Sequence, residues 1–539
     1  MRKQCLSQGL SSEIRAIFKL HGFSIKLDAA RSLEKKLERV DNELERSKWL
    51  EKIVESVRKL PLISPVIDES SLDAAIQECS QSENEEDNMF NVIDAFTTPK
   101  YIFDTEKKKY ILHKERHLPD LHLHGAAKSK GNFYMARFVN ILQRTQRHSL
   151  FSASSGWLGG ERKIQLKTVA DLMGAPGRVN SAVVLGMLCR LKAEKLFLED
   201  LTGTVELAFT EGIKLHTGLF CEQCVVLAEG WLEEGVLHVT GLGFPPMEAA
   251  AETRAQFGRL NFFGGPSKNC VADSVKLKQL EKRNPNATIV FASDLWLDRS
   301  IVFEKLDMML NGYSANPPVC FVFCGSFTSK NHGNKHFAQL KDGFKQLSDV
   351  LQRHPDLTER SSFVFVPSLT DPCLGNILPR PSLPAAVTAP VLSKVPNCHF
   401  TSNPARLQYC TQEIVVFRED IVEKMCRNAL KLPAKQQEIP THFCKTLLSQ
   451  GHLCPLPIHV SPVYWDYDHA LGLYPLPDLV VVCDKYESFT LSHPKEGCTI
   501  TNPGSFMRNK FAFQLYNLHS RTVEDCQLDA YDENSIDFG

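Results

Sequence analysis

The sequence contains no long apolar segment. Its apolar runs stay far below the ~18 residues that a membrane-spanning helix requires. The opening residues, MRKQCLSQGL, also lack the apolar stretch of a secretory signal. We therefore expect no membrane association and a nuclear or cytoplasmic location.

The sequence also lacks an excess of charge of either sign. Its 62 lysine and arginine residues nearly balance 63 aspartate and glutamate residues, which gives a net charge of −1. Strong, autonomous binding to DNA usually requires a concentrated basic surface. The balance argues against such binding. It leaves open an association with proteins and a contact with DNA inside a larger assembly.

Clustered metal-binding cysteines are missing as well. The 17 cysteines are scattered, and several lie inside apolar runs, which is typical of reduced, buried thiols. The single CxxC, Cys221–Cys224, has no second pair nearby, and zinc needs four ligands. We interpret these two cysteines as structural. Four neighbouring histidines lack an accompanying thiol or carboxylate cluster, and we interpret them as surface or packing residues: His113, His117, His122 and His124.

The length predicts about three domains, because a single core rarely serves more than about 250–300 residues. Residues 1–80 show apolar residues at helical spacing, for example Ile14, Ile17 and Phe18. They predict a small helical bundle that serves as a docking module. The acidic, polar stretch Gln81–Asn88 predicts a solvated linker. The predicted division is 1–80 helical domain, 81–160 linker with short strands and a helix, 161–247 barrel, 248–285 connector and 286–539 α/β domain.

Five strand-like runs with short turns follow in the third part. Five antiparallel strands of this length, with a longer connection between the third and fourth, predict an OB barrel. They are Ala182–Leu191, Lys195–Glu199, Thr204–Leu207, Val225–Trp231 and Val236–Leu242. OB barrels often bind single-stranded nucleic acid through aromatic and basic residues. The candidates are Phe197, Phe209, Phe220, Trp231, Arg190, Lys192 and Lys195. No dense basic stripe accompanies them, so we favour aromatic residues in the barrel core and ordinary surface lysines.

From residue 288 onward, apolar runs alternate with helical stretches, which predicts a layered α/β domain with a central sheet. The predicted strands are Thr288–Ser293, Val319–Cys324, Ser362–Val366, Ile414–Phe417, Leu479–Cys483 and Phe511–Leu515. The predicted helices are Leu277–Arg283, Val302–Leu310, Phe337–Leu351, Ile421–Leu430 and Thr441–Gln450. Asp294 directly follows the first strand. Open α/β sheets bind ligands at that end, so Asp294 is a candidate metal ligand or acid/base group.

Whether Asp294 can bind a metal ion depends on the residues at the ends of the other strands. They carry Gly325–Ser326, Ser368–Asp371 and Asp484–Lys485. Their order along the chain resembles that of calcineurin-like metallophosphoesterases. Such two-metal sites need a bridging carboxylate, several imidazoles and an asparagine.

This chain departs from that pattern at most positions. Trp296 stands where a histidine ligand is expected, and Ser326 replaces the bridging aspartate. Lys485 would bring a positive charge to the place of a cation. Asp294 and His452 alone cannot hold two metals. We therefore predict a phosphoesterase fold with an inactive site, with no catalytic, metal-binding or cofactor-binding residue and no cofactor.

An inactive phosphoesterase domain behind an OB barrel resembles the B-subunit family of the replicative DNA polymerases. Long irregular segments sharpen the resemblance to the epsilon branch of that family, and the resemblance covers essentially the whole chain. These segments are Phe262–Ser267, Ile377–Pro381, Gln408–Ile414, Phe417–Asp420, Leu448–Leu453 and Asn502–Phe506.

The resemblance implies a nuclear, non-catalytic accessory subunit in chromosomal replication. It implies that the OB and phosphoesterase domains bind the C-terminal domain of the catalytic subunit. It also implies two small histone-fold subunits in the same complex. The N-terminal bundle resembles the lid of AAA+ ATPases, which implies a link to the replicative helicase. Two alternatives stay open: a residual phosphodiesterase that uses Asp294 and His452 with Mn²⁺, and a free-standing single-strand binding protein that uses the barrel.

Overall fold

The structure is a computed structural model of the chain. It describes residues 14–37, 46, 49–51, 53–54, 57, 66–69, 71–73, 75–76, 89–116, 118, 120–151, 164–192, 195–373 and 375–528. The chain divides into two compact units, Met1–Asn88 with Pro266–Lys268, and Met89–Gly265 with Asn269–Gly539. No helix within the described ranges is long and apolar enough to cross a membrane.

The N-terminal unit has a small apolar core of its own. Helix α2 (Leu27–Leu37) places Leu33 and Leu37 one turn apart, and both are buried. Strand β1 (Ser24–Ile25) pairs in parallel with β2 (Val66–Ile67), whereas the sequence predicted helices only. A two-residue strand leaves no periodicity to read, which explains the omission. The core also contains Ile14, Phe18, Leu50, Ile53, Val54 and Val57. The predicted linker Gln81–Asn88 lies outside the described residues.

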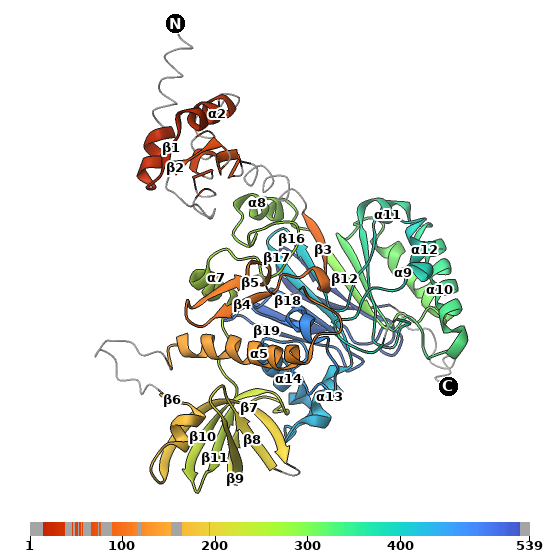
Figure 1. Ribbon diagram of the computed structural model, residues 1–539. Helices are drawn as coiled ribbons and strands as arrows, with labels where there is room; N and C mark the ends of the chain where they lie inside the picture. The colour runs from red at the N-terminus through yellow and green to blue at the C-terminus, as the bar shows by residue number, and fades with distance from the viewer. Residues whose placement is uncertain are drawn as a thin grey trace. The chain divides into compact units, whose positions relative to one another are not determined.

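The second unit contains a closed barrel (Figure 1). Around it the strands run β7–β8–β9–β11–β10, and β10 pairs back with β7. All five predicted strands are present. Strands β9 and β11 are parallel, which the prediction of antiparallel strands missed, because closure brings the third strand beside the fifth. The bounds are β6 Leu166–Lys167, β7 Val179–Lys192, β8 Lys195–Glu199, β9 Thr204–Leu215, β10 Val225–Glu233 and β11 Val236–Gly243.

The α/β part contains two six-stranded sheets, so the prediction of one central sheet was wrong. The first sheet has the order β15–β14–β13–β12–β21–β22, and the second has β19–β20–β18–β17–β16–β3. The bounds in the first sheet are β12 Thr288–Ser293, β13 Cys320–Cys324, β14 Ser362–Val366, β15 Cys398–Phe400, β21 Ala512–Asn517 and β22 Thr522–Gln527. In the second they are β3 Phe90–Asp94, β16 Ala405–Tyr409, β17 Gln412–Arg418, β18 Leu479–Cys483, β19 Phe489–His493 and β20 Cys498–Asn502.

The alternation of side chains along β12 shows how the sheets pack. Ile289 and Phe291 belong to a core that also contains residues of β16, β17 and β18, so this face of the first sheet packs against the second sheet. Val290 and Ala292 point the other way, into a core with the helices α9, α10 and α12. Both faces are therefore buried, which explains why the sequence of β12 is uniformly apolar.

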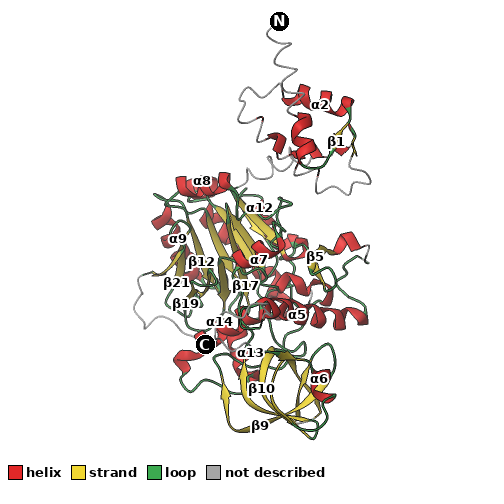
Figure 2. Cartoon of the chain, turned by 90° about the vertical axis from the view of Figure 1, so that its left-hand side faces the viewer, coloured by secondary structure: helices red, strands yellow, loops and turns green. Residues whose placement is uncertain are grey.

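Helices cover the outer faces of the two sheets (Figure 2). The described helices are α5 Ala127–Arg147, α6 Val169–Met173, α7 Ala250–Phe257, α8 Val275–Arg283, α9 Ser300–Tyr313, α10 His336–Leu351, α11 Pro355–Arg360, α12 Ala385–Leu392, α13 Ile421–Asn428 and α14 Ile439–Gln450. A hairpin of β4 (Tyr101–Asp104) and β5 (Lys109–Leu112) precedes α5. All the helices predicted from residue 277 onward are present within a few residues.

The barrel and the α/β part share one hydrophobic core. That core runs from the barrel interior through Cys221 and Cys224 to Leu447 of α14 and Phe417 of β17. Polar contacts reinforce the junction, because the side chain of Gln450 accepts from the backbone N–H of Val225 (2.8 Å) and donates to its carbonyl (2.9 Å). The helices α13 and α14 lie beside the barrel in both views (Figures 1 and 2).

Candidate functional site

The strand ends that carry the candidate residues lie at one edge of the two sheets. Strands β12, β13 and β14 are parallel, and Ser293, Cys324 and Val366 are aligned in register. Strands β17 and β18 are also parallel, with Arg418 opposite Cys483. Polar residues that follow these strands therefore gather at the edge where α/β proteins place their ligands.

Asp294 lies at this edge in a left-handed backbone conformation (φ 59°), which aspartate tolerates better than most residues. Its carboxylate is buried. The oxygen Oδ1 accepts from the backbone N–H of Ser326 (3.0 Å) and from Nη2 of Arg418 (2.7 Å). The carboxylate of this candidate residue is thus already engaged by a backbone amide and a guanidinium.

Arg418 is the central residue of the site. Its Nη1 donates to Asp420 Oδ1 (2.9 Å) and to the Cys483 carbonyl (3.1 Å), and its Nε donates to the Gly325 carbonyl. Burial alone would lower the pKa of Arg418, but the carboxylates of Asp294 and Asp420 outweigh it and hold that pKa well above its ordinary value. The guanidinium therefore stays charged while it connects the ends of β12, β13, β17 and β18.

The two other aspartates at the edge hold loops. Asp371 accepts from the backbone N–H groups of Phe327 (2.9 Å) and Ser368 (2.8 Å). Burial raises the pKa of Asp371 against these hydrogen bonds. Asp484 accepts from the N–H of Val422 (2.9 Å) and of Tyr486, and burial raises its pKa to about 6. Both carboxylates act as structural acceptors.

The remaining predicted residues are dispersed. Trp296 packs beside the helical core of the first sheet, with Arg508 over its ring at 5.5 Å. Lys485 lies at the surface and pairs with Glu423 at 2.7 Å, so the buried positive charge comes from Arg418 instead. His452 lies beside Asp468 (Nε2 to Oδ1, 3.3 Å), in contact with groups other than those around Asp294. Asp294 and His452 therefore do not form a pair.

The other metal candidates do not assemble either. Within the described ranges, no group of three or more histidine, cysteine, aspartate or glutamate residues is arranged to hold a metal ion. His117 lies outside those ranges. The thiols of Cys221 and Cys224 are buried and contact the carbonyls of Met425 and Pro455 at 3.5 Å each. Both cysteines contribute to the core shared by barrel and α/β part, as the structural interpretation predicted.

The candidate aromatic residues of the barrel divide into buried and exposed ones. Phe197 and Phe220 are buried, as the core interpretation predicted, whereas Phe209 is exposed. Trp231 stacks on His238 with ring centroids 5.1 Å apart, and the guanidinium of Arg178 lies 5.8 Å from the centroid of the Trp231 ring. Lys195 pairs with Glu206 at 2.6 Å. This surface mixes both charges, and a contact of the barrel with DNA stays a prediction.

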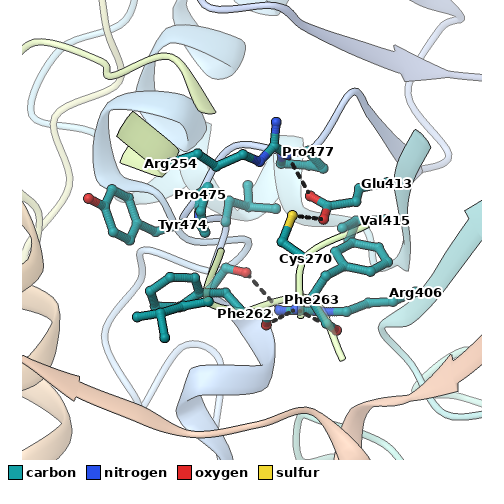
Figure 3. Close-up of a pocket in the computed structure, with 13 residues that line it drawn as sticks. Arg254, Phe262, Phe263, Cys270, Arg406, Glu413, Val415, Tyr474, Pro475 and Pro477 are labelled. Carbon is teal, nitrogen blue, oxygen red and sulfur yellow. Dashed lines mark hydrogen bonds and ion pairs between the residues drawn. The ribbon is translucent and has the colours of Figure 1, made fainter. Parts of the chain in front are cut away.

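A pocket lies between the connector and the second sheet (Figure 3). Arg406 of β16 donates from Nη1 to the carbonyls of Phe262 (3.0 Å) and Phe263 (3.2 Å), which anchors the connector. Arg254 lies 3.4 Å from Glu413 of β17 (Nη2 to Oε2). Burial raises the pKa of Glu413 from its ordinary value of 4.5 to about 7, although Arg254 opposes the shift. The polar groups of this pocket therefore hold the connector to the sheet.

The raised pKa of Glu413 predicts a pH effect. Between pH 4.5 and about 7 the folded chain keeps a proton that the unfolded chain releases, so the free energy of unfolding falls as the pH rises. The variant Glu413→Gln stays neutral. We expect it to be more stable than the wild type at pH 8 and nearly equal at pH 5, by urea denaturation at both pH values. The variant Glu252→Gln, at an exposed position, serves as the control. If Glu413→Gln differed from the wild type by the same free energy of unfolding at both pH values, the raised pKa of Glu413 would be contradicted.

Comparisons with known proteins agree with this architecture. Family models match three consecutive parts of the chain: the N-terminal domain of DNA polymerases epsilon at residues 7–79, the OB-fold domain of proteins like DNA polymerase epsilon subunit 2 at 127–246, and the B subunit of DNA polymerases alpha and epsilon at 289–491. A closed barrel joined to a two-sheet α/β part, with these matches in this order, defines the B-subunit class of replicative polymerases.

Comparison with curated relatives identifies the family within this class. The chain is 46% identical to DNA polymerase epsilon subunit 2 of Bos taurus over 97% of its own length and 99% of that protein. The Homo sapiens protein of the same name gives the same values, and that of Drosophila melanogaster is 40% identical over 96% of this chain and 98% of that protein. The chain belongs to the DNA polymerase epsilon subunit 2 family.

The sequence did not predict the role of Arg418 in this site. The segment Phe417–Asp420 stood out only through its resemblance to the polymerase family. The available signal was an arginine at the last position of an apolar strand, directly before two acidic residues. An arginine there is buried among other strand ends, and burial requires a partner for its charge.

Proposed function

We propose that this chain is a non-catalytic accessory subunit of the DNA polymerase epsilon complex in chromosomal replication, and that it holds the C-terminal domain of the catalytic subunit. Family membership supports the role as a polymerase epsilon subunit. The position of Arg418 is the observation that carries the non-catalytic part of the proposal. A buried guanidinium lies between Asp294 and Asp420, where a phosphoesterase would need open metal coordination.

The residues at the strand ends do not fit the two metals of an active phosphoesterase. Asp294, the first expected ligand, accepts from a guanidinium. Ser326 lies at the position of the expected bridging carboxylate, and its hydroxyl oxygen is hydrogen-bonded to that of Thr370, 2.7 Å away. Trp296 and Lys485 supply neither imidazole nor a free acceptor. We infer that the calcineurin-like layering of the α/β part persists as a scaffold whose metal site is lost.

The resemblance of the chain supports the remaining parts of the proposal. We assign the segments 161–247 and 286–539 to the binding of the catalytic subunit. We assign the N-terminal segment 1–80, which resembles an AAA+ lid, to a link with replicative helicase components. Two small histone-fold subunits would complete the complex, and the nucleus would be its location. The near-neutral charge of the chain is compatible with reaching DNA through these partners.

Co-expression tests the central claim. The full chain, expressed with the C-terminal domain of the polymerase epsilon catalytic subunit from the same species, is expected to elute as one equimolar complex in size-exclusion chromatography with light scattering. A catalytic-subunit fragment without that domain serves as the control and is expected to elute separately. Obligate subunits bury large apolar interfaces, so the chain expressed alone is expected to be less soluble.

Two results would contradict the proposal. The first is the absence of a complex when both proteins are soluble. The second is hydrolysis of a phosphodiester substrate by the purified chain in the presence of Mn²⁺, if the activity disappears in Asp294→Ala. That second result would show that the strand-end site binds metal and reacts, in spite of Arg418.

A further inference from the structure

The environment of Arg418 is built from both sheets. The ends of β12 and β13 belong to the first sheet and supply Asp294 and the carbonyl of Gly325. The ends of β17 and β18 belong to the second sheet and supply Arg418 itself and the carbonyl of Cys483. The guanidinium is thus a polar link between the two sheets at their strand ends. Elsewhere the sheets meet through apolar side chains and a few hydrogen bonds, such as that between Thr501 and Gln514 (2.7 Å).

The charges around Arg418 are mainly negative. Asp294 and Asp420 each accept a hydrogen bond from it. Asp484 lies nearby, since it directly follows Cys483, whose carbonyl accepts a hydrogen bond from Arg418. Lys485 also faces Asp420, but at 4.0 Å and from the surface. Asp294 and Arg418 are each only 6% exposed in their side chains, so water contributes little to neutralising this pair. Arg418 therefore supplies the buried positive charge beside Asp294 and Asp420, whereas a second buried arginine, Arg380, donates to the backbone carbonyl of Asp371.

We propose that Arg418 is the permanent cation of this site, and that it replaces the divalent ions of the phosphoesterase fold in two respects. It neutralises Asp294 and Asp420, and it joins the strand ends of the two sheets. This inference rests on the proposed loss of the metal site and explains how the fold keeps its acidic strand ends after that loss. Because the cation is covalently part of the chain, the site is closed to metal ions at any concentration.

Removing the guanidinium would take one hydrogen-bond donor and the neighbouring positive charge away from a group of oxygen atoms, although Asp294 and Asp420 would each keep a backbone N–H donor. These are the carboxylates of Asp294 and Asp420 and the carbonyls of Gly325 and Cys483. Carboxylate and carbonyl oxygens are the ligands that hard divalent cations prefer. In the variant Arg418→Ala, a divalent ion can take the place of the missing side chain. The stability of that variant is then expected to depend on added metal, unlike that of the wild type.

The experiment measures the melting temperature of the full chain in EDTA and in MnCl₂. The wild type and the control Arg427→Ala, which loses an exposed pair with Glu423, are expected to melt at the same temperature in both. Arg418→Ala is expected to melt lower in EDTA and to regain a large part of the loss in MnCl₂. Retention of Mn²⁺ after gel filtration, read by electron paramagnetic resonance, is expected for Arg418→Ala alone.

A second variant covers the case in which Arg418→Ala does not fold. Arg418→Ala combined with Asp294→Asn removes the more deeply buried of the two charges that the guanidinium compensates, and it takes one carboxylate ligand from the group. It is therefore expected to fold and to melt with little or no response to Mn²⁺. The inference is overturned if the double variant is no more stable than Arg418→Ala, if Mn²⁺ leaves a folded Arg418→Ala unchanged, or if Mn²⁺ stabilises the wild type equally. Formation of the complex with the catalytic subunit, measured on the wild type, tests the proposed function separately.

Discussion

Replacement of Asp468 by alanine is expected to lower the free energy of unfolding by about 3–5 kcal/mol, because it leaves an arginine whose side chain is only 12% exposed without its carboxylate partner. Arg137 of α5 donates to both carboxylate oxygens of Asp468, from Nε at 2.9 Å and from Nη2 at 2.5 Å. His452 approaches the same carboxylate at 3.3 Å. The buried charge of Arg137 raises the energetic cost far above that of a surface pair. Urea denaturation of the purified chain measures the change.

The exposed pair of Asp349 and Lys394 provides the control for this prediction. Asp349→Ala removes one partner of an ion pair in water, which typically changes stability by about 0–1 kcal/mol. If both variants lost the same small amount, the pair of Arg137 and Asp468 would not anchor α5 as the buried geometry indicates.

The variant Gly325→Ala is expected to destabilise the chain by about 3 kcal/mol or more, because the strand-end site has no room for a methyl group. A Cβ atom at this position would lie 2.0 Å from Oδ2 of Asp371 and 2.9 Å from the backbone nitrogen of Ser368. Asp371 would have to move, and the N–H groups of Phe327 and Ser368 would lose their acceptor. Thermal and urea denaturation of the purified variant provide the measurement.

Gly312→Ala is the matched control, since Gly312 lies in helix α9 and, among the described residues, no atom beyond its chain neighbours and the backbone of its own helix lies within 4 Å of the place that a Cβ would take there. Alanine is the better helix former, so this variant is expected to gain about 0.5–1 kcal/mol. Loss of stability in Gly312→Ala comparable to that in Gly325→Ala would mean that the space around Gly325 does not set the cost.

Apolar strands whose two faces are both buried were predicted well from the sequence. The bounds of β12, β14 and β18 agree with those read from their apolar runs. Strand β16, by contrast, carries Arg406 and Gln408, and both are buried. The carbonyl groups that accept hydrogen bonds from Arg406 belong to Phe262 and Gly472, which are far away in the sequence. A local pattern cannot show that such partners exist, so polar strands of this kind were missed.

Only part of the candidate site was predicted from the sequence, and the reason is similar. Asp294 was placed at a strand end, and its burial there agrees with that position. Its partner Arg418 is separated from it by 124 positions, on a strand of the other sheet. The strand ends expected beside Asp294 were those with Gly325, Ser368–Asp371 and Asp484, and the strand end that carries Arg418 was not among them. Lys485 brings its positive charge to the rim of the site, 4.0 Å from Asp420, but its shorter contact is with Glu423 at the surface.

The core shared by the barrel and the α/β part has a mechanical consequence. Gln450 of α14 completes the hydrogen bonding of Val225 in the barrel, and Leu447 of the same helix packs in the common core. Packed interiors deform little and transmit strain. A force that a bound protein applies to the barrel therefore also acts on the α/β part, because α14 contacts both.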